Sequence, residues 1–166
     1  QPDEYEKIPE GTPLEMVKAA GVVGMGGAGF PTGIKLDAHL DHGYILINAA
    51  ECEPGLYHNI RQIEQQSDKI VRGVKYCMDI AGADKAIFAI KKKNEKAIDA
   101  LRTAIKDEKA MTIHLLPDIY PMGEERAVVR ECLGIELETT QLPSAANAVV
   151  VLSLIHISEP TRQAEI

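Results

Sequence analysis

The sequence predicts an α/β fold in which a mainly parallel sheet is covered by helices on both faces. Short apolar runs, typical of buried strands, alternate along the chain with segments whose apolar residues repeat at helical spacing. The predicted strands end in polar turns that carry Asn, Asp, Glu or Lys side chains. Strands and helices that alternate in this way form parallel sheets, which bind ligands beyond the carboxyl ends of their strands.

The first predicted helix covers residues 13–20. Thr12 precedes it as an N-cap and Glu15 lies in its first turn, which together are typical of a helix start. A glycine-rich run follows, and we expect a second short helix over residues 34–40, which carries Lys35. Polar residues, two prolines and a glycine make up residues 1–11, so an extended segment is predicted there.

Four strands are predicted in the remainder of the chain, over residues 44–49, 86–90, 111–116 and 148–151. The first two are short continuous apolar runs, typical of buried strands, and Pro117 ends the third. Apolar residues recur every three or four positions in three intervening segments, which predicts helices over residues 59–81, 94–106 and 124–133. Gly82 and Gly134 follow two of these helices directly and are expected to end them.

Composition narrows the possible functions. The 166 residues suffice for one domain with a buried core, and a formal net charge of −7 argues against a nucleic-acid partner. The only dense basic run, Lys91 to Lys93, is expected to be a solvated loop at a strand end. No apolar run is long enough to span a membrane. The three cysteines are few and widely spaced, which suits a reducing cytoplasm and provides no metal or cluster site.

Residues 24–35 read Gly-Met-Gly-Gly-Ala-Gly-Phe-Pro-Thr-Gly-Ile-Lys and predict an anion site. Glycines allow consecutive main-chain N–H groups to converge on an anion, and Lys35 adds a positive charge suited to phosphate. The spacing from Gly24 formally matches the dinucleotide fingerprint, but a helix precedes the run and Pro31 follows it. We therefore reject an ordinary dinucleotide loop. A flexible glycine linker is the alternative.

Two acidic turns lie after predicted strands. The first, residues 48–55, reads Asn-Ala-Ala-Glu-Cys-Glu-Pro-Gly, and the second, residues 120–125, reads Tyr-Pro-Met-Gly-Glu-Glu. Asn48 and Glu51 have the hydrogen-bonding groups to grip the amide–imide edge of a flavin ring, and Tyr120 can flank a planar ring. The alternatives are a solvated turn for the first and an ordinary acidic helix start for the second.

Together the three motifs resemble the FMN-binding domain of the 51 kDa subunit of respiratory complex I. They are more similar still to the C subunit of the Rnf electron-transport complex, which shares Glu-Cys-Glu-Pro. Met-Gly-Glu-Glu-Arg-Ala at residues 122–127 and Gln-Leu-Pro at 141–143 look most like the Rnf C-like protein associated with proline reductase. The resemblance covers residues 19–151 and implies a Rossmann-like sheet that forms an incomplete FMN-binding domain.

The resemblance also implies a set of site residues. The glycine loop and its lysine match the FMN phosphate and ribityl contacts, and the acidic turns match contacts along the rest of the cofactor. Phe30 and Glu53 match residues beside NADH. Ala50 stands where the complex I subunit has an Asp. No catalytic or metal-binding side chain is expected, because the flavin performs the redox chemistry. The implied cofactor-binding residues are Gly24, Gly26, Gly27, Ala28, Lys35, Asn48, Glu51, Tyr120, Gly123, Glu124 and Glu125.

The implied function is that of an electron-transfer flavoprotein subunit, an oxidoreductase of the NADH dehydrogenase type. FMN would accept hydride from NADH, and electrons would pass to iron–sulfur centres, with 4Fe-4S clusters expected only in downstream sequence. Other electron-transfer subunits or ferredoxin are the expected partners. The expected location is cytoplasmic, with membrane contact only through partner subunits. Two alternatives stay open: a docking domain that has lost flavin, and an FMN protein that exchanges electrons with ferredoxin instead of NADH.

The two ends of the chain are expected to lie outside this domain. Residues 152–162 are similar to one reading frame of an adapter used in transposase-based sequencing libraries. We therefore expect residues 152–166 to be a non-native tail. The chain begins with Gln1, which suggests a fragment, and residues 1–18 are treated as an N-terminal segment. A further flavin-binding segment of the family, Asn-Val-Glu/Gly-Thr, would follow Val151.

Overall fold

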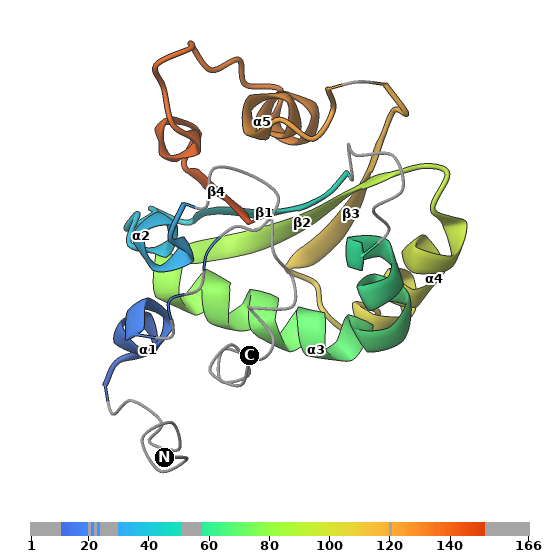
Figure 1. Cartoon of the computed structure of the whole chain (residues 1–166), viewed down its shortest axis with the longest axis horizontal. Coiled ribbons are helices and arrows are strands. Elements are labelled where there is room, and N and C mark those ends of the chain that lie inside the picture. The colour runs from blue at the N-terminus through green and yellow to red at the C-terminus, as the bar shows by residue number, and fades with distance from the viewer. Residues whose placement is uncertain are drawn as a thin grey trace, which may run out of the picture.

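The computed structural model describes residues 11–19, 21, 23, 30–50, 58–119 and 121–151. Within these ranges the centre of the domain is a four-stranded parallel sheet of order β3-β2-β1-β4 (Figure 1). The predicted α/β class is confirmed. The strands are β1 (Gly43–Ala49), β2 (Ala83–Lys91), β3 (Met111–Leu116) and β4 (Ala148–Val151).

The helices of the described ranges agree with the predicted pattern at most positions. Gly82 and Gly134 end α3 and α5 with φ angles of 76° and 70°, as predicted. Gln66 departs from helical geometry inside α3. A 3-10 turn, η2, was not predicted. The bounds are α1 (Pro13–Ala19), α2 (Thr32–Leu36), α3 (His58–Ala81), α4 (Glu95–Ala104), α5 (Glu125–Leu133) and η2 (Pro143–Ala146).

The start of α1 is capped as the sequence predicts. The Thr12 main-chain N–H donates to Glu15 Oε2 at 2.8 Å, and the Glu15 N–H donates to Thr12 Oγ1 at 3.4 Å. This reciprocal pair is a capping box, which satisfies main-chain donors that have no partner within the helix.

The predicted bounds of the second helix were wrong. The helix begins two residues earlier than expected, because the Pro31 carbonyl accepts hydrogen bonds from the N–H groups of Ile34 and Lys35. It ends at Leu36, and His39 has a left-handed φ of 47°, which a continuing helix would not allow. Lys35 nevertheless lies in this helix, as expected.

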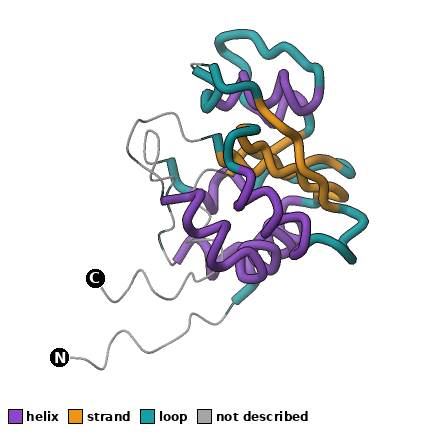
Figure 2. The backbone as a smooth tube through the Cα atoms, turned by 90° about the vertical axis from the view of Figure 1, so that its right-hand side faces the viewer, coloured by secondary structure: helices purple, strands orange, loops and turns teal. Residues whose placement is uncertain are grey.

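The sheet is enclosed by two layers of helices (Figure 2). On β1, Ile45, Ile47 and Ala49 pack into the same core as α3 and α4. Leu46 and Ala50 point the other way and pack with Met122 and the buried side of α5. A strand that is buried on both faces explains why β1 reads as a continuous apolar run.

Gly82 offers a test of the close approach between the end of α3 and the segment before β1. A Cβ atom at Gly82 would lie 2.7 Å from the Leu40 carbonyl oxygen, whereas nothing lies within 4 Å of one at Gly134. Both residues have a left-handed φ, which costs a non-glycine residue about 1–2 kcal/mol. We expect Gly134→Ala to lower the free energy of unfolding by about that amount and Gly82→Ala to lower it clearly further, as measured by urea denaturation. Equal losses would contradict the contact.

Candidate functional site

The candidate site lies beyond the carboxyl ends of β1 and β4. From β1 the chain proceeds through β2 to β3 on one side, and it later returns to place β4 on the other side of β1. In open α/β sheets this reversal of strand order opens a crevice at the carboxyl edge. Side chains from α2, from β1 and from the start of α5 meet at this edge.

Asn48 joins the end of β1 to the turn before α5. Its side chain is buried, with the residue only 4% exposed. The amide nitrogen donates to the Gly123 carbonyl at 2.9 Å, and the amide oxygen accepts the Ala50 N–H at 3.1 Å. An asparagine amide has two donors and two acceptor positions, so one of each remains beyond the contacts it makes with the described residues. Two of the predicted motifs are thus held together by one polar side chain.

Lys35 joins the glycine-rich motif to the second acidic turn. Its ammonium forms an ion pair with the Glu125 carboxylate, and the exposed fractions of the two side chains are 19% and 30%. The same ammonium donates to the Val150 carbonyl of β4 at 3.4 Å and lies 5.9 Å from the centre of the Phe30 ring. Phe30 is itself about half exposed, at 46%. A half-buried cation therefore lies beside the carboxyl end of β4, with a carboxylate as its partner.

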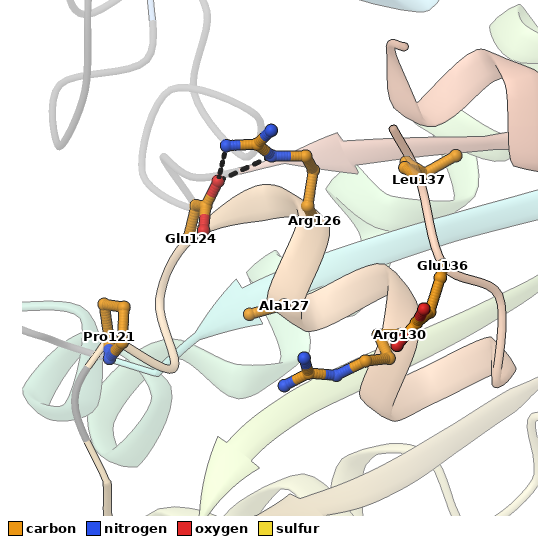
Figure 3. Close-up of a pocket in the computed structure, with 7 residues that line it drawn as sticks. All are labelled: Pro121, Glu124, Arg126, Ala127, Arg130, Glu136 and Leu137. Carbon is orange, nitrogen blue, oxygen red and sulfur yellow. Dashed lines mark hydrogen bonds and ion pairs between the residues drawn. The ribbon is translucent and has the colours of Figure 1, made fainter. Parts of the chain in front are cut away.

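Glu124 lines a hollow along α5. It accepts a hydrogen bond from Arg126 Nε at 2.6 Å, and Arg130, further along α5, also lines the hollow (Figure 3). The hollow has a volume of about 280 Å³. Its remaining lining residues are Pro121, Ala127, Glu136 and Leu137.

Part of the predicted site lies outside the described residues. Lys35, Asn48, Gly123, Glu124 and Glu125 are described and gather at the carboxyl edge, with Phe30 beside Lys35. The predicted residues outside the described ranges are Gly24, Gly26, Gly27, Ala28, Glu51, Glu53 and Tyr120, and their roles stay predictions.

Lys91 corrects one expectation. The run from Lys91 to Lys93 was expected to be a solvated loop, but Lys91 is the last residue of β2 and is only 6% exposed. The sequence around Lys91 does not signal this burial, because its compensating carboxylate, Asp118, follows a different strand.

The thiols that the structure describes have raised pKa values. Burial raises the pKa of both Cys77 and Cys132 to about 12, so neither carries a thiolate at neutral pH. Among the described ranges, no three His, Cys, Asp or Glu side chains gather as a metal site. None of the helices described there is both long and apolar enough to cross a bilayer.

Comparison with known proteins identifies the domain. The sequence model of the Nuo51 FMN-binding domain matches residues 17–156. The chain belongs to this family. The match confirms the resemblance to the complex I 51 kDa protein and to its Rnf counterpart, whereas the finer likeness to the proline-reductase-associated protein stays a prediction. The Nuo51 family name also establishes this chain as an FMN-binding domain of an electron-transfer family.

Curated relatives of the Nuo51-type domain include cobalamin reductase PduS from Salmonella typhimurium, which is 40% identical over 151 residues. That alignment covers 90% of this chain and 33% of PduS. The C subunit of the proton-translocating ferredoxin:NAD(+) oxidoreductase complex of Clostridium ljungdahlii is 38% identical over 82% of this chain and 30% of that protein. The chain thus spans about a third of the length of these relatives.

A solved structure supports the fold of the Nuo51-type domain. The air-oxidized NAD+-reducing NiFe-hydrogenase contains a chain that superimposes with a TM-score of 0.76 at 25% sequence identity. The superposition covers 92% of this chain and 30% of the hydrogenase chain. The parallel sheet and its two helical layers are therefore the shared fold.

Proposed function

We propose that the full-length protein is a flavoprotein subunit that binds FMN at the carboxyl edge of β1 and β4, accepts reducing equivalents from NADH and delivers them to iron–sulfur centres. The observation that carries this proposal is the convergence of Lys35, Asn48 and Glu125, which come from three separate motifs, on one sheet edge. FMN, when bound, would supply the exchange between two-electron and one-electron chemistry.

The side chains present fit such a cofactor. Lys35 offers a cation to the phosphate, and an anion that binds there must share the ammonium with Glu125 or displace it. Asn48 is buried and keeps one donor and one acceptor position for a polar ring edge. We assign the glycines of residues 24–27, Ala28, Glu51 and Tyr120 to the same cofactor, and Phe30 and Glu53 to the nucleotide.

The relatives support NAD(H) as the nicotinamide partner of the flavin. The names of the Clostridium ljungdahlii complex and of the hydrogenase both include NAD(+). The first name also includes ferredoxin, which keeps an exchange with ferredoxin as the second candidate function. The Clostridium ljungdahlii relative is by name a subunit of a complex, so we propose that this protein works with other electron-transfer subunits in the cytoplasm or at the membrane surface.

Anaerobic absorption spectroscopy of the full-length protein tests this proposal. We expect bound FMN, seen as visible flavin absorbance, and rapid bleaching of that absorbance when NADH is added. Dithionite serves as the positive control for reduction. A protein that takes up no FMN would refute the proposal in favour of a docking domain. If reduced ferredoxin bleaches the bound flavin and NADH does not, ferredoxin replaces NADH as the proposed electron donor.

A further inference from the structure

Lys91, the last residue of β2, is a buried lysine at the carboxyl edge of the sheet. Ala89 pairs with Asn48 in the β1–β2 register, so Lys91 lies one pleat further toward the carboxyl edge. Its neighbour on β3, Leu116, belongs to the core beneath α5, which places Lys91 on the same face of the sheet as α5. A buried ammonium is costly unless a carboxylate compensates it.

The compensating carboxylate is Asp118, in the loop between β3 and the second acidic turn. Lys91 Nζ lies 3.1 Å from Asp118 Oδ1, and Lys93 Nζ lies 2.9 Å from Asp118 Oδ2. Hydrogen bonds from Lys93 and then Lys91 hold the pKa of Asp118 below its usual range, so the carboxylate is charged at neutral pH. The two lysines differ in setting, because the Lys93 side chain is 55% exposed and that of Lys91 is 8% exposed.

The loop that contains Asp118 is therefore held at three described points. Asp118 pairs with Lys91 at the end of β2. Met122 is buried in the core beneath α5. The Gly123 carbonyl accepts the hydrogen bond from Asn48 at the end of β1. The same loop leads into Glu124 and Glu125, so its position determines where those carboxylates lie.

We propose that Lys91 is a positioning residue for the flavin site: its ion pair with Asp118 fixes the described residues 117–119 and 121–125 against the end of β2. This inference rests on the proposed function. The Lys91 pair, not the Lys93 pair, has the larger effect, because ion pairs between exposed side chains contribute little. Lys91 is also the partner that reaches into the interior: its side chain is 8% exposed, so its contact with Asp118 ties the loop to the buried end of β2, whereas Lys93 contacts the same carboxylate from the surface.

Three substitutions in the full-length protein test the role. We expect Lys91→Met to weaken FMN binding by about tenfold or more, in the range of a lost charged hydrogen bond, and to change the visible circular dichroism of the bound flavin. Lys91→Arg keeps the charge and is expected to restore both. Lys93→Met removes the exposed contact to the same carboxylate and should leave FMN affinity within about twofold.

A second control lies in the opposite helical layer. Lys75 of α3 is paired with Glu108 at 2.5 Å, and Lys75→Met should change neither FMN affinity nor the flavin spectrum. If Lys91→Met does not fold, Asp118→Asn removes the other partner of the same ion pair. The Asp118 side chain is 48% exposed, and its substitution is also expected to weaken FMN binding. The inference would be overturned if Lys91→Met and Lys93→Met had the same FMN affinity and the same flavin circular dichroism.

Amide hydrogen exchange separates this inference from the proposed function. We expect faster exchange in residues 119–125 in Lys91→Met than in the wild type, with exchange elsewhere in the sheet unchanged. This measurement needs no cofactor. A wild-type protein that takes up no FMN would refute the proposed function only, whereas unchanged exchange in residues 119–125 would overturn the positioning role itself.

Discussion

Replacing Lys35 by methionine is expected to weaken FMN binding to the full-length protein by about ten- to a hundredfold while the fold persists. A hydrogen bond to a charged group contributes about 1.5–3 kcal/mol, and 1.4 kcal/mol corresponds to a factor of ten in affinity. The fold should persist, because methionine keeps the apolar stem of Lys35 and the Glu125 carboxylate, at 30% exposed, stays in contact with water. Titration of the apoprotein with FMN, followed by quenching of flavin fluorescence, measures the affinity.

Riboflavin makes this experiment specific to the phosphate. Riboflavin lacks the phosphate group, so Lys35→Met should leave its affinity close to that of the wild type. Lys18→Met is the matched control, since Lys18 is an exposed lysine of α1 whose ammonium pairs with Asp37 at 2.7 Å. If Lys35→Met loses affinity for FMN and riboflavin equally, Lys35 contacts the ring system and not the phosphate. If its FMN affinity is unchanged, Lys35 is not part of the binding site.

Asn48→Asp is expected to have the largest effect on the stability of the domain. The substitution replaces the donor to the Gly123 carbonyl by a second oxygen and adds a charge at a position that is almost fully buried. An uncompensated buried charge costs about 3–5 kcal/mol. Asn48→Ala should cost about 1–3 kcal/mol, because it leaves polar groups unpaired without adding charge. Urea denaturation measures both, and FMN titration should show weaker binding for each.

Asn147 provides the control for Asn48 at the other edge of the sheet. Its side chain also bridges two segments: the amide nitrogen donates to the Asp41 carbonyl at 2.6 Å, and the amide oxygen accepts the Asp41 N–H at 3.1 Å. Asn147→Ala is expected to destabilise the domain comparably and to leave the intrinsic FMN affinity unchanged. If Asn48→Ala binds FMN as tightly as Asn147→Ala does, Asn48 supports the fold without a role in the site.

Lys91, at the end of β2, shows where the position of a residue in a strand and the charge of its side chain lead to different predictions of burial. Predicted and observed bounds coincide for β3 and β4. In the carboxyl half of β2, a continuous apolar run correctly reports burial on both faces of a parallel sheet. Lys91 lies in such a strand but is charged, and its burial depends on Asp118, a residue that follows a different strand. Pairing across strands is invisible to a pattern read along one strand.

The sequence by itself determined the α/β class, the order of the elements and the chemistry of the three motifs, because each depends on neighbours a few residues apart. Only the tertiary structure decided which motif residues meet. Lys35 and Glu125 are 90 positions apart, and Asn48 and Gly123 are 75 apart. These contacts follow from the strand order and from the layer in which α5 packs, and local periodicity encodes neither.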